Sequence, residues 1–456
     1  MRVIAIDLGA SSVRVAAIDL DRAPFEVEIV HRWPHAPVEH TDGTLRWDWA
    51  GIVTEVRRGL DRALDVAPAD SIGVDGWGVD YGLLGPDGQL VTPPYSYRDR
   101  RTGGWQHVAD RIGWRELYET TGIQLMPINT IFQLASHDRG ELEAAERLLL
   151  LPDLLVHELT GYVGAERSNA STTALLDVRT GEWAQALVDA IEVPPRLLAP
   201  IRTATEPVGS YQTVPVHLVG SHDTASAFAA APGVPGPGTA LVASGTWFLV
   251  GAERDAPDLS DEARRANFSN ELGATGGVRF LKNVTGLWML EQCRVGWGHP
   301  PIEGLLAAAE AVDGPVPVVD TADARFLSPA DMEAEVRAAA GLAPSAPRGV
   351  VVRCVLESIA QTTAGVVAEL AQFAARPVDE VFVLGGGSRM QLMHRLLEQR
   401  TGVPVRVGTA EAAALGNALV QGIALGRFAD LAEARAALSA GDGGSVDTDD
   451  PPRAEE

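Results

Sequence analysis

The chain has 456 residues and a formal net charge of −24, with 46% hydrophobic and 21% charged residues. This length predicts two to three domains, and the apolar content excludes a disordered chain because large cores can form. The acidic balance argues against nucleic acid and against an anionic membrane as partners, since both need a basic protein surface. Two cysteines, Cys293 and Cys354, are too few for a disulfide scaffold and fit a reducing, cytoplasmic location.

The sequence opens with two strands joined by a short turn. Residues 3–9 are predicted to form a buried strand, 10–12 a tight polar turn and 13–19 the returning strand. The apolar run is broken by Asp7, so we expect neither a signal peptide nor a membrane span here, and no later uninterrupted apolar stretch reaches transmembrane length. Backbone N–H groups of such a turn can surround phosphate oxygens, and Asp7 could hold Mg²⁺ directly or through water. A hairpin with a capping aspartate explains the same pattern equally well.

Further alternation of strands and helices follows. A helix is predicted near 49–64 and a strand at 71–75, which runs into the polar and aromatic motif at 75–80. Residues 95–180 show no simple period and are expected to be an insertion that decorates a core sheet. A strand at 216–219 ends at Ser221-His222-Asp223-Thr224.

The main domain boundary is predicted in the Pro- and Gly-rich link at 232–238. Residues 239–251 repeat the opening pattern of strand, small polar turn and strand, which indicates a duplicated domain. Later residues predict a strand at 380–384, three glycines at 385–387, a helix at 390–400, a strand at 403–407 and a small-residue helix at 410–424. This order predicts a sheet covered by helices, and the residues from 441 onward are expected to be disordered.

Four features could carry chemistry together with Asp7. The turn at 243–247 repeats the first turn, and the glycines at 385–387 allow close backbone approach to a ligand ahead of a helix N-terminus. Asp223 at a strand end could accept a hydroxyl proton during phosphoryl transfer, although a helix N-cap explains it as well. The fourth feature is a set of polar and aromatic residues suited to sugar hydroxyls; it comprises residues 75–80, Arg98, Asp99, Gln124, Asn129, Lys282 and Asn283.

In this order the motifs resemble those of the FGGY carbohydrate kinases, and within that family those of kinases acting on L-rhamnulose. The motifs that carry the resemblance are 7–12 with Arg14, 75–80, 97–99, 101–102, 122–124, Pro127, 129–130, 152–153, 159–161, 168–173, 221–226, 244–247, 281–283, 286–288, 385–387, 411–412 and 416–417. Each motif is weak alone, but the ordered set is specific and covers nearly the whole chain outside the tail.

The resemblance implies a fold and a reaction. The expected fold is α/β, with duplicated actin-like ATPase (ribonuclease H-like) domains around a central cleft. The expected divisions are a sugar-binding domain at 1–232, a nucleotide-binding domain at 233–440 and an acidic tail at 441–456. The implied reaction is ATP- and Mg²⁺-dependent phosphorylation of L-rhamnulose at its 1-hydroxyl. The implied partners are the ketose and ATP, with no obligatory protein partner.

The resemblance also implies roles for individual residues. Asp223 is expected to be the catalytic base, and Asp7 to hold Mg²⁺ directly or through water. The residues expected to contact the sugar are Gly78, His222, Asp223, Thr224 and Asn283. The residues expected to contact ATP are Ala10, Ser11, Ser12, Val13, Arg14, Thr246, Glu291 and Gly386.

Two positions depart from the family pattern. Val13 stands where these kinases often have glycine, which bears on the turn geometry. Glu291 stands where a neutral glutamine is expected near ATP, so its carboxylate could face Mg²⁺, the base or solvent.

Three alternatives remain open from the sequence. The first is a kinase for another ketose or polyol, such as L-fuculose or xylulose. The second is an actin-like or chaperone-like nucleotide switch, which would not need His222 and Asp223 at a cleft. The third is an inactive homologue that senses sugar.

Overall fold

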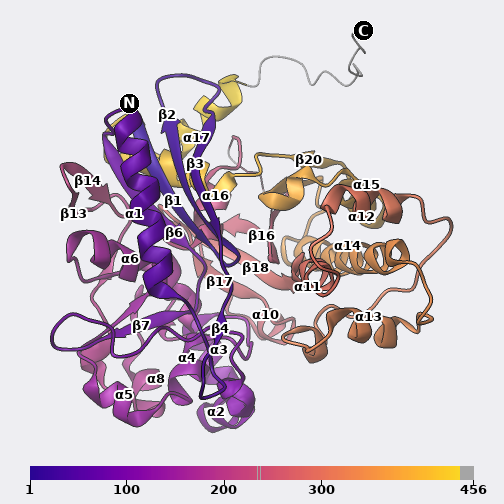
Figure 1. The fold of residues 1–456 in the computed structure, drawn as a ribbon, viewed down its shortest axis with the longest axis horizontal. Helices are drawn as coiled ribbons and strands as arrows, with labels where there is room; N and C mark the ends of the chain where they lie inside the picture. Colours follow the sequence, from indigo (N-terminus) through magenta and orange to yellow (C-terminus); the bar gives the residue numbers. More distant parts are fainter. Residues whose placement is uncertain (234, 237, 442–456) are drawn as a thin grey trace.

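The computed structural model describes residues 1–233, 235–236 and 238–441. Two six-stranded sheets form its framework, one from each half of the chain (Figure 1). The first has the order β13-β14-β6-β1-β2-β3, with bounds Pro207–Tyr211, Val214–His217, Ser71–Gly76, Arg2–Gly9, Ser12–Asp19 and Val27–Pro34. The second has the order β17-β18-β16-β15-β19-β20, with bounds Ser269–Leu272, Val278–Thr285, Trp247–Arg254, Thr239–Ser244, Glu380–Leu384 and Val405–Val407.

The two sheets share one topology. In the first, β1, β2 and β3 form an antiparallel meander, and β6 and β14 follow in parallel on the other side of β1. In the second, β15, β16 and β18 form the meander, and β19 and β20 follow in parallel beside β15. The duplicated ribonuclease H-like architecture that the sequence predicted is therefore confirmed.

Helices cover these sheets because their apolar residues recur on one face. In α1 (Trp49–Val66), Ile52, Val56 and Leu60 are buried, and Asp48 caps the first turn by accepting from the Gly51 N–H at 3.0 Å. The remaining α-helices are α2 (Trp105–Ile112), α3 (Trp114–Thr121), α4 (Thr130–Ala135), α5 (Arg139–Ala144), α6 (Leu151–Thr160), α7 (Arg167–Ala170), α8 (Gln185–Ala190), α9 (Asp223–Ala229), α10 (Asp261–Arg265), α11 (Trp288–Gly296), α12 (Ile302–Glu310), α13 (Met332–Ala340), α14 (Arg348–Phe373), α15 (Gln391–Thr401), α16 (Ala412–Ala424) and α17 (Leu431–Gly441).

Residues 95–180 lie outside the two large sheets, as an insertion should. They form α2 to α7 and contribute to small two-stranded sheets (Figure 1). The strands of the small sheets are β4 (Val38–Glu39), β5 (Leu45–Arg46), β7 (Tyr81–Leu84), β8 (Arg147–Leu150), β9 (Ala165–Glu166), β10 (Leu176–Asp177), β11 (Glu182–Trp183) and β12 (Ile201–Arg202). The 3-10 helices span Arg100–Gly104, Ser171–Thr173, Pro195–Leu197, Ala324–Phe326 and Gly386–Arg389.

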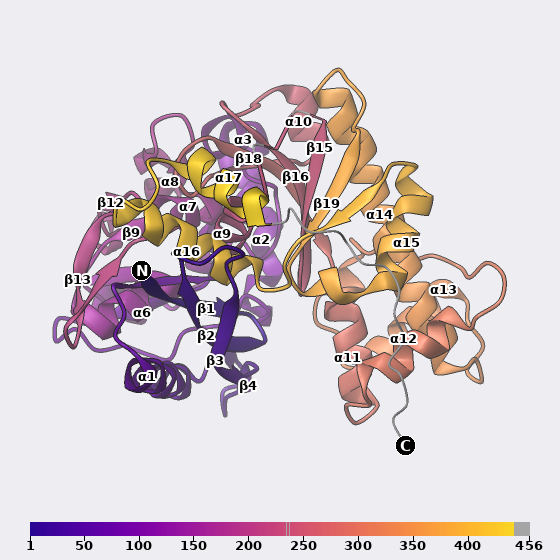
Figure 2. The same ribbon diagram turned by 90° about the horizontal axis from the view of Figure 1, so that it is seen from above.

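Helix α16 follows the second sheet in sequence but packs on the first. Figure 2 shows α16 and α17, in yellow, beside the indigo strands β1 to β3. At the crossing of α16 with α9, a Cβ on Gly416 would lie 1.7 Å from the Ser226 carbonyl oxygen, so only glycine allows this approach. Gln421 then reaches the sheet itself, where its Nε2 donates to the Ile4 carbonyl at 3.0 Å. The division at residue 232 stays a prediction, and α16 ties the two sides of it together.

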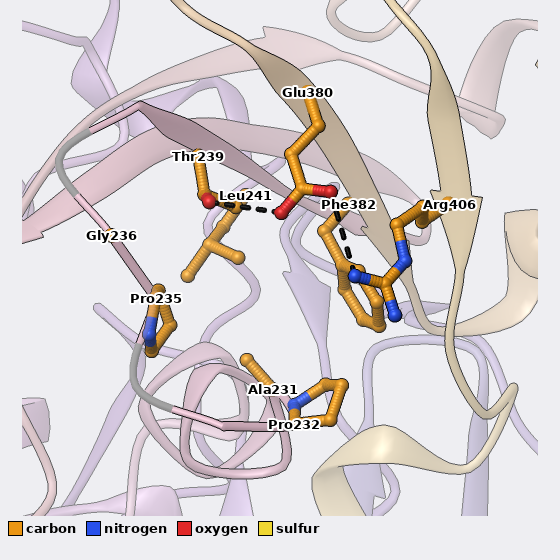
Figure 3. A pocket seen from close by; sticks show the side chains of 9 residues that line it. All are labelled: Ala231, Pro232, Pro235, Gly236, Thr239, Leu241, Glu380, Phe382 and Arg406. Atoms are coloured by element: carbon orange, nitrogen blue, oxygen red, sulfur yellow. Dashed lines mark hydrogen bonds and ion pairs between the residues drawn. The ribbon is translucent and has the colours of Figure 1, made fainter. Parts of the chain in front are cut away.

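A hollow lies beside the link between the sheets (Figure 3). Thr239 and Glu380 line it, and the Thr239 hydroxyl donates to Glu380 Oε1 at 3.0 Å. These residues begin β15 and β19, whereas the turns singled out in the sequence follow the ends of those strands. The hollow therefore lies at the end of these strands opposite to those turns.

Two sequence predictions concern the absence of a membrane span and the acidic tail. Within 1–233, 235–236 and 238–441, α14 is the one helix long and apolar enough to cross a membrane by length and composition. Its most apolar window is 72% buried in the protein, which is typical of a core helix. The predicted tail, 441–456, lies outside the described residues except for Gly441.

Candidate functional site

Asp7 lies at the edge where β1 turns into β2. Its strand neighbours are Arg14 on β2 and Asp75 on β6, and Arg14 Nη1 donates to Asp7 Oδ2 at 2.6 Å. Asp7 is 4% exposed, and burial raises the pKa of its carboxyl against the opposing effect of Arg14. The negative charges of Asp223 and Glu411 raise that pKa further. The predicted metal ligand therefore belongs to an acidic centre with one arginine in direct contact.

Asp75 is the second carboxylate of this centre, and it is fully buried. Asn417 on α16 donates to Asp75 Oδ2 at 2.6 Å, while Oδ1 has no hydrogen-bond partner among residues 1–233, 235–236 and 238–441. Burial raises the Asp75 pKa well above its usual range, and the charges of Asp7 and Asp223 act in the same direction. A buried carboxylate oxygen without a donor favours a proton or a cation nearby.

Asp223 is the third carboxylate and begins α9 at the edge of the first sheet. Its side chain is 29% exposed, and the Thr224 hydroxyl donates to its Oδ1 at 3.1 Å. Because its charge raises the pKa of both Asp7 and Asp75, the predicted base lies close to the predicted metal ligand. Among the carboxylates of the centre, Asp223 is the one open enough to meet a substrate.

His222 precedes Asp223 and is held from both sheets. Its Nε2 lies 3.5 Å from Asp223 Oδ1. On the other side of the ring, Nδ1 lies 3.2 Å from Nη1 and Nη2 of Arg279 and 3.3 Å from Oε2 of Glu271. Arg279 and Glu271 come from β18 and β17, so they approach from the second sheet. The sequence analysis assigned no role to this pair; the one signal available was Arg279 within the apolar start of β18, between Val278 and Phe280.

Glu166 anchors the backbone beneath His222. It is fully buried, and its Oε2 accepts from the Ser221 N–H at 2.9 Å, the Ser221 hydroxyl at 3.0 Å and the Ser168 N–H at 3.0 Å. The Ser168 hydroxyl in turn accepts from the His222 N–H at 3.2 Å. These bonds fix the strand end on which the His222–Thr224 motif is mounted.

The first predicted phosphate loop is a two-residue turn at Ala10-Ser11. Ser12 and Val13 belong to β2, and the Val13 side chain is completely buried in the sheet core. Valine in place of the glycine that is common in the family therefore leaves the hairpin register intact, with Val13 opposite Leu8. His35 supports the turn, because its N–H donates to the Ser11 carbonyl at 3.1 Å and its Nε2 contacts the Gly9 carbonyl oxygen at 3.0 Å.

The second and third loops pack against each other at the edge of the second sheet. Gly385 has a φ of 83°, and a Cβ there would lie 2.8 Å from the Ser244 carbonyl oxygen. Thr246 belongs to the neighbouring turn, where its carbonyl accepts from the N–H groups of Gly286 and Trp288 at 3.2 Å each. Gly386 begins a 3-10 helix, so the glycines at 385–387 lead directly into a short helix.

Glu411, just before α16, connects the first and third loops. Its carboxylate pairs with Arg32 at 2.8 Å, with Arg389 at 3.0 Å and with Arg14 Nε at 3.5 Å. Arg14 follows the first loop and Arg389 ends the 3-10 helix of the third. This carboxylate contacts three guanidinium groups and therefore keeps the first and third loops next to each other. The sequence included Glu411 only as part of a motif and did not predict this role.

Glu291 does not join the acidic centre. It lies on α11, pairs with Arg294 at 3.3 Å and lies 3.9 Å from the ring of His299. Its side chain is 42% exposed. Of the three surroundings considered for this carboxylate, the structure gives it solvent together with a basic neighbour.

The predicted sugar-binding set is only partly brought together. Asn283 on β18 donates through Nδ2 to Gln124 Oε1 at 3.0 Å, which joins the insertion to the second sheet. Gly78 packs so closely on Thr172 that a Cβ would lie 2.9 Å from its hydroxyl oxygen. Arg98 stacks on Trp288, with its guanidinium carbon 3.4 Å from the ring centroid, and so also bridges the two halves.

Other members of that set have structural roles. Asp80 is buried and accepts from the indole N–H groups of Trp47 at 2.7 Å and Trp77 at 3.0 Å; burial raises its pKa to about 6. Asn129 accepts from the Met126 N–H at 2.8 Å at the start of α4. Lys282 pairs with Glu369 and lies over Phe268, on the core side of the second sheet.

Within the described residues, no group of three or more histidine, cysteine or acidic side chains is arranged to bind a metal ion by protein ligands alone. Asp7 already accepts a hydrogen bond from the Arg14 guanidinium, whereas Asp75 Oδ1 receives no donor from the part of the chain that the structure describes. The centre is therefore suited to a cation that takes most of its ligands from phosphate oxygens and water, as Mg²⁺ does in phosphoryl-transfer sites.

Comparison with known proteins matches both halves of the chain to one family. Residues 2–228 match the N-terminal domain and residues 240–425 the C-terminal domain of the FGGY family of carbohydrate kinases. A curated protein named rhamnulokinase from Bacteroides thetaiotaomicron is 36% identical over 95% of this chain and 93% of its own length. One of the same name from Enterococcus faecalis is 36% identical over 95% and 92%.

Solved structures support the fold. A ligand-bound xylulose kinase from Lactobacillus acidophilus superposes with a TM-score of 0.76 at 16% identity, covering 95% of this chain and 91% of that one. A glycerol kinase from Plasmodium falciparum with ADP superposes with a TM-score of 0.74 at 14% identity, covering 96% and 92%. At these identities the likeness extends to the fold alone.

Proposed function

Because this chain belongs to the FGGY family of carbohydrate kinases, we propose that it transfers the γ-phosphoryl group of ATP to the 1-hydroxyl of L-rhamnulose. The observation that carries the substrate is the 36% identity, over 95% of the chain, to curated proteins named rhamnulokinase. The enzyme class itself, a carbohydrate kinase that uses ATP, follows from the family. The products are L-rhamnulose 1-phosphate and ADP.

Asp223 is the proposed base. As the 1-hydroxyl oxygen forms its bond to the γ-phosphorus, its proton passes to the Asp223 carboxylate, and the electron pair of the broken bond leaves with ADP. Two features support this role: Asp223 is the most exposed carboxylate of the acidic centre, with a side chain 29% exposed, and it is held by Thr224. The sugar contacts proposed beside it are Gly78, His222, Thr224 and Asn283.

The three loops are the proposed phosphate-binding elements. Ala10 to Arg14, Thr246 and Gly386 would offer backbone N–H groups and one guanidinium to ATP. Glu411 supports this arrangement, since it ties Arg14 to Arg389 and so keeps the first and third loops together. Glu291 would contact ATP from the edge of the site, because Arg294 partly neutralises the negative charge of its carboxylate.

Asp7 is the proposed residue that holds Mg²⁺, through water because Arg14 occupies its Oδ2. When bound, the ion would neutralise charge on the phosphate oxygens. Residues 1–232 and 233–440 are proposed to act as two domains that exclude water around the sugar. The proposal includes no obligatory protein partner, and the two free, buried cysteines fit a cytoplasmic location.

A coupled assay of ADP release tests the substrate. The purified protein is given L-rhamnulose, L-fuculose, xylulose and glycerol in turn, with and without Mg²⁺. The proposal expects the highest kcat/KM for L-rhamnulose and no turnover without the metal. A clear preference for xylulose would contradict the substrate while leaving the enzyme class intact, and ADP release independent of sugar would contradict sugar phosphorylation.

A further inference from the structure

We propose that Arg279 is a positioning residue that fixes His222 as the neutral tautomer carrying its proton on Nε2. This inference deepens the proposed function, because that tautomer turns a hydrogen-bond donor toward the space beside Asp223. The argument rests on the contacts of the Arg279 guanidinium, which is 1% exposed and comes from the second sheet, whereas His222 is mounted on the first.

The Arg279 guanidinium is held rigidly. Its Nε and Nη2 both donate to the Leu272 carbonyl, at 3.2 and 3.0 Å. Nη1 lies 3.2 Å from Glu271 Oε2. Nη1 and Nη2 each donate to His222 Nδ1, at 3.2 Å. A planar fork fixed at one end in this way leaves the histidine ring little freedom to rotate.

The direction of these hydrogen bonds determines the tautomer. A guanidinium has five N–H donors and no acceptor, so His222 Nδ1 must accept and its ring proton must lie on Nε2. The competing arrangement has a proton on Nδ1 that is donated to Glu271 Oε2 at 3.3 Å. That arrangement would point an N–H bond at the two N–H bonds of Arg279. Glu271 Oε2 makes no hydrogen bond with the described residues, but the charge of Arg279 Nη1 at 3.2 Å already balances its own.

The consequence lies on the other side of the ring. Nε2 is 3.5 Å from Asp223 Oδ1, so an Nε2–H group can donate to the carboxylate or to a sugar hydroxyl that lies against it. In the other tautomer a lone pair would face the carboxylate and repel it. Because Arg279 and His222 belong to different sheets, the donor is set only while the sheets are in contact as they are here.

The test measures the tautomer directly. In the full-length protein labelled with ¹⁵N-histidine, long-range ¹H–¹⁵N correlation spectra distinguish protonated from unprotonated ring nitrogens, and His222→Gln identifies the resonances of His222. The expected result in the unmodified protein is a protonated Nε2 and an unprotonated Nδ1. A protonated Nδ1 overturns the proposal, whether the ring is neutral or doubly protonated.

Variants test whether Arg279 is the cause. Glu271→Leu with Arg279→Met removes both charges together, so no unpaired buried carboxylate is left to unfold the protein. The expected result is loss of the exclusive Nε2–H tautomer. Glu271→Gln, which keeps the guanidinium, and Arg46→Met, which removes a buried arginine elsewhere, should both retain it. An unchanged tautomer in the double variant would show that Arg279 does not set it.

Kinetics supply a second readout. The double variant should raise the KM for the ketose about five- to tenfold, the loss expected for one hydrogen bond, and leave the KM for ATP essentially unchanged. Equal changes in both constants would indicate general damage and contradict a positioning role. The tautomer is measured without any sugar, so the inference can fail while the proposed function stands, and the reverse.

Discussion

Replacing Asp223 with asparagine separates catalysis from stability. Asparagine keeps the shape and the Oδ1 acceptor for the Thr224 hydroxyl, but it cannot take a proton from the sugar. Loss of a general base lowers kcat by about 10²- to 10⁴-fold, which corresponds to about 3–5 kcal/mol in the barrier. We expect kcat to fall in this range while the KM for ATP is nearly unchanged.

The free energy of unfolding of the Asp223→Asn variant should change little. The loss of an acidic side chain from the first turn of α9 removes about 0.3–1 kcal/mol of helix-dipole stabilisation. In the opposite direction, the buried carboxyls of Asp7 and Asp75 no longer face a third negative charge. The two effects oppose each other, so the free energy of unfolding in urea should stay within about 1 kcal/mol of the unmodified value.

Asp261→Asn is the matched control. Asp261 also begins a helix, α10, but it pairs with Arg115 on the surface away from the acidic centre. The Asp261→Asn variant should have a kcat within a factor of about two of the unmodified enzyme, since a surface substitution affects mainly its own surroundings. A folded Asp223→Asn protein whose kcat is within tenfold of the unmodified enzyme would refute Asp223 as the base.

Two further predictions concern the framework. Gly416→Ala should lower the free energy of unfolding in urea by about 3 kcal/mol, because the new Cβ would meet the Ser226 carbonyl. The control Gly365→Ala in α14, whose Cβ would meet nothing within 4 Å, should raise it by about 0.5–1 kcal/mol. Equal effects of the two substitutions would contradict the close crossing of α9 and α16. Burial lowers the pKa of His35 to about 4, so its unfolded form, with a pKa near 6.5, binds a proton that the folded form refuses. Stability should therefore fall by about 3 kcal/mol on this account as the pH drops from 6.5 to 4, and His35→Gln should flatten that dependence in urea titrations; an unchanged slope would contradict the burial of this ring.

The framework was predictable because local patterns specify it. The opening run Val3–Ile6 is apolar and is followed, after Asp7 and Leu8, by a small polar turn, and residues 239–251 repeat the pattern of strand, turn and strand, so both hairpins could be expected. Strand ends followed by Gly, Ser and Asp indicated where the loops would gather. The identification of Asp223 rested on the motif around it, and the structure adds the two neighbouring carboxylates that make its position chemically meaningful.

The contacts across the sheets could not be predicted. Arg279 and His222 are 57 residues apart, and nothing in the local sequence of either one indicates the other. Asn417 lies 342 residues from Asp75, and the small residues of α16 predict close packing without naming the partner. Glu291 was placed by its motif near ATP, but its surroundings depend on Arg294, one turn further along the same helix.

The most direct measurement is the identity of the product. The purified protein is incubated with L-rhamnulose, ATP and Mg²⁺, and the reaction is followed by ³¹P NMR. The account predicts a new phosphate monoester resonance split by the two protons on C1, together with ADP in equal amount. A resonance split by a single proton would place the phosphate on a secondary hydroxyl, and ADP accompanied only by inorganic phosphate would contradict transfer to the sugar.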